Sequence, residues 1–254
     1  MPKYVKKNKK YLIILSVILF LVTGIFCANI CSIAFIASSI QNTSDIRTNE
    51  FELYLLSTAK SKLEKSAQEL AKDYQPIGAG GFIWKNDEYF YVISSAYINK
   101  NDAQLVKNNL ETNSNIQCEI IPVHFNSYKL GTITDNESKK VLQRAVNIFY
   151  ANYLQLFDIA VSLDTAVYNE ISARLAINTV NSNINSAIAD FKTLFTQTDN
   201  EEIQKLSKAL VKAQSISTKL ASGIKVNKEQ TYSSLIKFRY TELLATLFEL
   251  INNT

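Results

Sequence analysis

The chain has few of the residues from which metal and redox sites are built. It contains one histidine and three cysteines, and its one methionine is the initiator. Zinc clusters, haem ligand sets and disulfide frameworks each need several such side chains. We therefore expect no metal site, no cofactor and no disulfide scaffold.

A basic surface is also missing. The formal net charge is +4, but five lysines lie within the first ten residues, so the rest of the chain is close to neutral. Nucleic-acid binding needs lysine and arginine along a contact face, and we expect no nucleic-acid partner. Hydrophobic residues make up 47% and charged residues 20%, which excludes both a disordered chain and a polytopic membrane protein.

The N-terminal segment combines those lysines with a long apolar run. No charged residue occurs from Tyr11 to Ser44, and a helix needs about 20 apolar residues to cross a bilayer. The pattern predicts a cytoplasmic tail at 1–10, a transmembrane helix at 11–40 and an extracytoplasmic body. A single-pass protein of the cell membrane is the expectation, and 11–40 is its contact with lipid.

Two alternatives apply to the same segment. A signal peptide has an apolar core of about 7–15 residues; this run is longer, although Ala37-Ser38-Ser39 would serve as a cleavage site. Cys27 and Cys31 are one helical turn apart. They are interpreted as small apolar residues of the helix, with a disulfide between two copies as the alternative. Neither follows a small residue, so lipid acylation is not expected.

The remaining sequence divides into three parts by periodicity. Apolar residues at a 3-4 spacing predict an amphipathic stalk helix at 49–76. The spacing changes to two at 78–134, which indicates a β-hairpin that turns at Asn86-Asp87, a helix capped by Asn99 or Asn101, and a strand that ends near Pro122. Segment 136–254 contains no proline and predicts an antiparallel helical bundle with breaks near Tyr168, Thr198 and Val226.

These assignments define an α+β fold class. It consists of an N-terminal transmembrane helix, a stalk helix, a small antiparallel sheet with a helix, and a C-terminal helical bundle. The inward positions of the bundle are apolar residues at heptad or helical spacing, among them Leu142, Phe149, Leu156, Ile171, Leu175, Ile184, Leu206, Leu210, Leu243 and Leu247.

No motif of a known catalytic site is present. The sequence lacks a Gly-x-Ser-x-Gly, a His-Glu-x-x-His and a phosphate-binding loop. Gly78-Ala-Gly-Gly81 precedes a strand rather than a helix, so it is interpreted as a flexible entry to the hairpin. His124 is expected to be structural or solvated, and Cys118 a buried thiol. We therefore expect no enzymatic activity and no catalytic residues.

One stretch resembles a known family. Phe90-Tyr-Val-Ile-Ser-Ser-Ala-Tyr97, followed by Ala103 and Leu110, is similar to the opening of the SPOR (sporulation-related repeat) domain. Two residues depart from that pattern, because Ile93 stands where the family has glutamine and Ser95 where it has glycine. The resemblance implies a βαββαβ fold, of which the first half is expected here. It also implies binding to peptidoglycan glycan strands, in cell division or sporulation.

The hairpin alternation adds a candidate binding surface. With a turn at Asn86-Asp87, Trp84 lies opposite Tyr89, and one sheet face carries aromatic rings with polar tips. Rings of this kind stack on sugars. The candidate glycan-binding residues are Trp84, Tyr89, Tyr91, Ile93 and Ser95. Alternatively, the bundle or the stalk covers this face and the rings belong to the core.

Two functions remain open at this point. The first is a membrane-anchored, SPOR-type peptidoglycan-binding protein. The second is a non-catalytic, membrane-anchored scaffold, whose stalk and bundle bind protein partners or a second copy of the chain.

Overall fold

A computed structural model describes residues 45–132, 135–222 and 230–252, with side chains at 48–130, 135–222 and 230–252. Residues Ser44–Thr254 form one compact unit. The predicted tail at 1–10 and the predicted span at 11–40 lie outside the described residues, as do Cys27 and Cys31.

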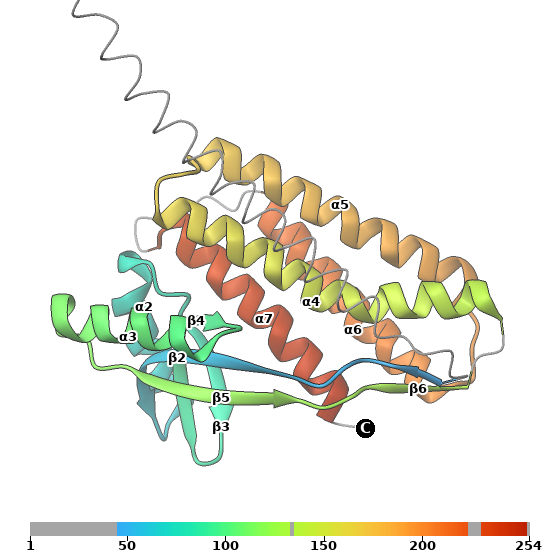
Figure 1. The fold of residues 1–254 in the computed structure, drawn as a ribbon, viewed down its shortest axis with the longest axis horizontal. Coiled ribbons are helices and arrows are strands. Elements are labelled where there is room, and N and C mark those ends of the chain that lie inside the picture. Colours follow the sequence, from blue (N-terminus) through green and yellow to red (C-terminus); the bar gives the residue numbers. More distant parts are fainter. Residues whose placement is uncertain (1–44, 133–134, 223–229, 253–254) are drawn as a thin grey trace, which may run out of the picture. The chain divides into compact units, whose positions relative to one another are not determined.

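The described chain is a mixture of strands and helices (Figure 1). In chain order the elements are β1 (Asp45–Arg47), β2 (Phe51–Ser61), α2 (Glu64–Tyr74), the 3-10 helix η1 (Gln75–Ile77), β3 (Phe82–Asn86), β4 (Tyr89–Tyr97), α3 (Lys100–Ser114), β5 (Glu119–Phe125), β6 (Lys129–Thr132), α4 (Asn136–Asp164), α5 (Glu170–Phe195), α6 (Glu201–Ala221) and α7 (Tyr232–Asn252).

Four strands form an antiparallel sheet in the order β3-β4-β2-β5. Along the chain, β2-α2-β3 is followed by β4-α3-β5, which is the βαββαβ order of a split βαβ fold. The two halves interleave, because β2 lies between β4 and β5. The short strands β1 and β6 pair separately from this sheet.

The predicted stalk helix at 49–76 is wrong over most of its N-terminal half. Phe51–Ser61 is a central strand, β2, and only Glu64–Tyr74 is α-helical. Leu53, Leu55 and Leu56 are all buried, because a central strand covered on both faces is apolar at successive positions. Such a run also satisfies a 3-4 spacing, so periodicity alone does not distinguish it from a helix.

The predicted hairpin is present in a different register. Its two connecting residues are Asp87 and Glu88, and Trp84 pairs with Tyr91 rather than with Tyr89. Asp87 has a positive φ of 51°, which aspartate tolerates in turns. A shift of two residues preserves the alternation of faces, whereas a shift of one would reverse it. The predicted face membership of the aromatic residues therefore survives.

The segment that follows the hairpin is close to its prediction. Helix α3 begins after Asn99, whose side chain accepts a hydrogen bond from the backbone N–H of Asn101 at 2.8 Å. Pro122 lies within β5, which is an edge strand and therefore tolerates the missing backbone donor.

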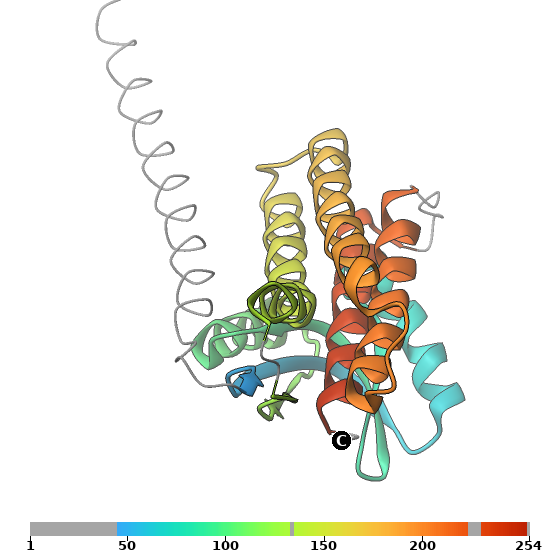
Figure 2. The same ribbon diagram turned by 90° about the vertical axis from the view of Figure 1, so that its right-hand side faces the viewer.

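Helices α4 to α7 form the predicted bundle. Figure 2 shows them side by side, and each of α4 and α6 packs against both α5 and α7. Asp135, Asn169 and Asn200 cap the first three helices through their side chains. Helix α7 also packs against β3, β4 and β5, so it lies between the sheet and the other bundle helices (Figure 1).

The fold class needs correction beyond the stalk. Within residues 45–132, 135–222 and 230–252, no helix is both long and apolar enough to cross a membrane. The transmembrane helix of the predicted fold class therefore has no counterpart among the described helices. The sheet is also not a separate unit at 78–134, because its first strand is β2 and its core continues into the bundle.

Candidate functional site

The predicted glycan-binding face lies against helix α7. Trp84, Tyr91, Ile93 and Ser95 are buried, and Tyr89 is half-buried. Four of the five predicted residues are therefore core residues in this fold, which is the alternative that the sequence left open. The physical reason is that the bundle supplies an apolar helix for the face that α2 and α3 leave uncovered.

Hydrogen bonds fix α7 to the middle of this face. The Ser95 and Tyr240 hydroxyls lie 2.6 Å apart, and the backbone N–H of Ala96 donates to the Tyr240 oxygen over 3.4 Å. From α4, the Tyr153 hydroxyl donates to the backbone oxygen of Ala96 over 3.1 Å. Burial raises the pKa of Tyr153 and of Tyr240, so both hydroxyls stay protonated. Ser95 thus has a protein partner where a sugar hydroxyl was expected.

Aromatic contacts extend the same interface to either side. The Trp84 and Phe248 ring centroids are 5.3 Å apart, and those of Phe82 and Phe238 are 5.4 Å apart, both edge to face. Such pairs contribute about 0.5–1.5 kcal/mol beyond the area that they bury. The aromatic face that was expected to bind sugars therefore packs against a helix of the same chain.

The glycine-rich segment Gly78–Gly81 is also part of this interface. A Cβ at Gly80 would lie 3.1 Å from the backbone carbonyl carbon of Lys237 and from the backbone nitrogen of Phe238. The Ser234 hydroxyl donates to the oxygen of Ala79, and the Lys237 ammonium donates to the oxygen of Gly78 over 2.9 Å. The prediction of a flexible entry is wrong, because this segment packs tightly on α7.

Tyr89 marks the one end of the predicted face that stays partly open. The ammonium groups of Lys60 and Lys62 lie 5.2 and 5.4 Å from the centroid of its ring. Lys60 also pairs with Glu119 over 2.8 Å, and Lys62 with Glu88 over 2.9 Å. This cluster at the end of the sheet combines an aromatic ring with charged hydrogen-bonding groups.

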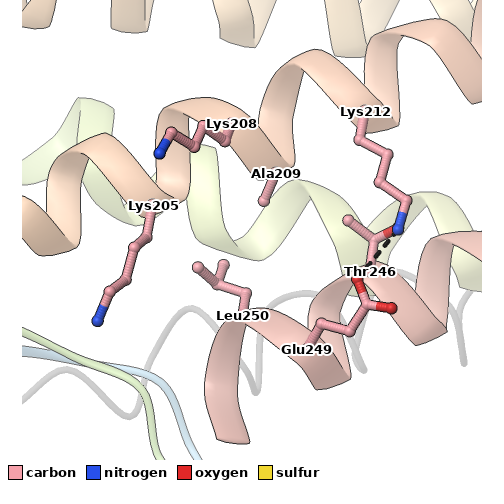
Figure 3. A pocket seen from close by; sticks show the side chains of 7 residues that line it. All are labelled: Lys205, Lys208, Ala209, Lys212, Thr246, Glu249 and Leu250. Atoms are coloured by element: carbon pink, nitrogen blue, oxygen red, sulfur yellow. Dashed lines mark hydrogen bonds and ion pairs between the residues drawn. The ribbon is translucent and has the colours of Figure 1, made fainter. Parts of the chain in front are cut away.

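A groove lies between α6 and α7. Its volume is about 310 Å³, and its lining consists of Lys205, Lys208, Ala209 and Lys212 from α6 and Thr246, Glu249 and Leu250 from α7 (Figure 3). The volume is at the lower limit for small-molecule sites.

The groove has an apolar floor and a basic rim. Ala209 and Leu250 face each other across it, with Lys205 and Lys212 on either side (Figure 3). Lys212 pairs with Glu249 over 3.0 Å, and Lys205 with Glu202 over 2.7 Å. The sequence analysis missed this surface. Its signal was the spacing of Lys205, Lys208 and Lys212, which places three lysines on one side of a helix.

Exposed apolar side chains concentrate at the turn between α4 and α5. Val167 and Leu175 are each 66% exposed and Ile171 is 71% exposed, with Val161 and Tyr168 also exposed. The prediction that Ile171 and Leu175 face inward is wrong. In this part of α5 the buried residues are Ala173 and Ile177, two positions after the predicted ones, whereas the predicted inward residue Ile184 is buried as expected.

The polar residues weighed for chemistry do not converge. Within the described part of the chain, no three or more His, Cys, Asp or Glu side chains gather as a metal site. Cys118 is buried, and burial raises the pKa of its thiol. His124 is exposed, with Glu50 3.8 Å from its Nε2 atom.

Comparison with known proteins does not add a family. No protein family, no curated protein and no solved structure matches this chain.

Proposed function

We propose that this protein is a non-catalytic interaction protein that binds a partner protein through its helical bundle. The observation that carries the proposal is the position of α7. Because α7 covers the aromatic face of the sheet, that face is not available to a ligand, whereas the bundle keeps exposed surfaces for a partner.

Two surfaces of the bundle support protein binding. The turn between α4 and α5 exposes Val167, Ile171 and Leu175, and exposed apolar side chains that occur together typically mark protein interfaces. The groove between α6 and α7 adds an elongated depression with an apolar floor. In the groove, Lys205 and Lys212 are paired with Glu202 and Glu249, so these groups serve ion pairs.

Site-specific photo-crosslinking in living cells tests this function. A photoreactive amino acid at Ile171 or at Lys208 should give adducts of one defined protein, identified by mass spectrometry. The same amino acid at Lys72, which is exposed on α2, is the matched control and should give none. Absence of protein adducts at both bundle positions would refute the proposal.

Peptidoglycan binding is the second candidate, and the chain order favours it. The βαββαβ order of the sheet region is the one that the SPOR resemblance implies. The resembling stretch, however, lies in the third strand of the unit, β4, so β2-α2-β3 is the half that precedes it. The stretch that resembles the opening of the family's domain therefore begins the second half of the βαββαβ unit here, whereas the sequence analysis expected it to begin the first half.

A glycan site in this fold would have to lie at Tyr89. Tyr89 keeps a partly exposed ring, and Lys60 and Glu119 beside it supply donors and acceptors for sugar hydroxyl groups. Sedimentation with purified sacculi tests this candidate. Wild-type protein that sediments, together with Tyr89→Ala protein that stays folded and soluble, would favour glycan binding. Wild-type protein that remains in the supernatant would exclude it.

A further inference from the structure

The α6–α7 groove has a basic rim. Its rim carries three lysines, and two carboxylates lie close enough to pair with them, Glu202 and Glu249. Within the described residues, Lys208 forms no ion pair, although it stands between the two lysines that do. The rim of the groove therefore keeps one lysine, Lys208, without a carboxylate partner.

The floor of the groove is built for an apolar side chain. Ala209 is a small residue on α6, and Leu250 lies across from it on α7 (Figure 3). Both are buried to more than nine-tenths in the bundle. The Thr246 hydroxyl, which also lines the groove, already donates to the backbone oxygen of Glu242 over 2.9 Å. This hydroxyl therefore does not need a ligand as its hydrogen-bond acceptor.

The lysines of the rim follow the axis of α6. Lys205 and Lys212 are seven residues apart on α6, which corresponds to two helical turns or about 10 Å. Recognition of an amphipathic helix uses a groove of this kind, with apolar anchors one turn apart and charges along the flank. Because the rim carries three lysines, it favours a partner helix that has acidic residues along its flank.

We propose that the α6–α7 groove binds an acidic amphipathic helix of a partner protein. An apolar residue of that helix rests on Ala209 and Leu250, and a carboxylate on its flank pairs with Lys208. Lys205 and Lys212 lie at the two ends, where they exchange Glu202 and Glu249 for carboxylates of the partner. This inference rests on the proposed function and names the chemistry of the partner at one of the two bundle surfaces.

Fluorescence anisotropy of a labelled peptide tests the groove directly. The probe is a helical peptide of about four turns, with leucine on one face and glutamate on both flanks, titrated with the full chain at low ionic strength. We expect saturable binding that weakens as salt is added, because the ion pairs are exposed. A peptide with lysine in place of glutamate, and one with serine in place of leucine, should each bind at least tenfold more weakly.

Charge reversal locates the binding. Lys208→Glu should weaken binding about tenfold, whereas Lys192→Glu on the exposed side of α5 is the matched control and should leave it unchanged. Lys208 is exposed, so both variants should melt as the wild type does. Ala209→Leu fills the floor and should abolish binding, and Lys208→Gln is the milder variant that keeps the test valid where Ala209→Leu melts early.

Three outcomes would overturn the inference. The first is no binding of the leucine–glutamate peptide, and the second is equal weakening by Lys208→Glu and Lys192→Glu, which would show unspecific attraction. The third is displacement of the peptide by inorganic polyphosphate with higher affinity, which would identify the groove as a site for a phosphate polymer. Crosslinks from Ile171 to a protein would persist in each case, so failure here is distinguishable from failure of the proposed function.

Discussion

The two faces of the four-stranded sheet are covered by helices of very different kinds. On one face, α2 and α3 pack over a small core in which Ala67, Ala71 and Val92 are buried. The partly buried residues around it are Ala59, Leu70, Ile83 and Phe90. Small side chains let short helices approach the sheet closely, and little aromatic area is buried.

The other face carries the aromatic rings and shares its core with the bundle. Trp84, Tyr91 and Phe125 belong to the same buried cluster as residues from all four bundle helices. The difference shows that the bundle completes the sheet rather than following it as an independent domain. Aromatic rings on a sheet face can bind a ligand or pack against a helix, and in this chain they pack against α7.

Removing one aromatic ring from each face should give the largest difference in the free energy of unfolding. Trp84→Ala should lower the free energy of unfolding by about 3–5 kcal/mol, because it leaves a cavity under Phe248. Phe90→Ala, on the α2 side, should cost only about 1–2 kcal/mol, because its ring is already half-exposed. Urea denaturation followed by circular dichroism measures both. Equal costs would show that the two faces contribute alike.

Neighbouring residues on β4 test whether the sheet and the bundle unfold together. Ile93 and Val92 are both fully buried, but they point to opposite faces. Ile93→Ala should cost about 2–4 kcal/mol. It should also lower two midpoints by the same amount: that of Trp84 fluorescence, which reports the contact of the sheet with α7, and that of helical ellipticity, which comes mainly from the bundle.

Val92→Ala is the companion variant and should cost less, about 1–2 kcal/mol, since it removes fewer carbons. Separate midpoints for the two signals, in either variant, would mean that sheet and bundle are independent units after all.

The sequence predicts some elements of this fold well and others poorly. The bundle helices are long and have side-chain caps, so periodicity located them, and Leu142, Phe149 and Leu156 are buried as expected. Central strand β2 was mistaken for a helix, because burial on both faces removes the alternation that identifies a strand. Ile171 and Leu175 were placed inward, since spacing alone does not fix the rotation of a helix.

The candidate site shows the same limit. Alternation correctly grouped Trp84, Tyr91 and Ile93 on one face. What covers that face depends on Tyr240 and Phe248, more than a hundred residues later, and no local pattern predicts such a contact. The groove between α6 and α7 likewise depends on how two helices pack, and only its lysine spacing is visible in the sequence.

Alkaline pH should destabilise the contact between the sheet and the bundle, because two buried tyrosines lie in it. Burial raises the pKa of Tyr240 and of Tyr153 above 10.0, whereas in the unfolded chain both ionise near pH 10. Their contribution to stability is therefore complete below pH 10. It falls as the pH rises further, because the unfolded state then loses protons that the folded state retains. Each such tyrosine should contribute about 1.4 kcal/mol per pH unit to this loss.

The variant Tyr240→Phe measures how much of this loss of stability at alkaline pH comes from Tyr240. At pH 7 the variant should be less stable by about 1–2 kcal/mol, because the Ser95 hydroxyl and the Ala96 N–H lose their partner. Between pH 10 and 11, the stability of the variant should fall less steeply than that of the wild type, by about 1 kcal/mol over this pH unit, because the tyrosine of the unfolded chain is only partly ionised there. Denaturation midpoints across this range measure the slope, and an unchanged slope would show that Tyr240 ionises in the folded state.

The smallest predicted effect concerns the contact of Gly80 with α7. Gly80 does not have a positive φ, so alanine is compatible with its backbone, and an unhindered Gly→Ala change would stabilise by about 0.4–1 kcal/mol. At this position the new Cβ meets the backbone of Lys237 and Phe238 at 3.1 Å. The helix must then move away from the sheet, which typically costs about 1–3 kcal/mol. We therefore expect Gly80→Ala to destabilise by about 1 kcal/mol, and thermal melting decides the sign. A gain in stability would show that α7 lies less closely on the sheet than the structure places it.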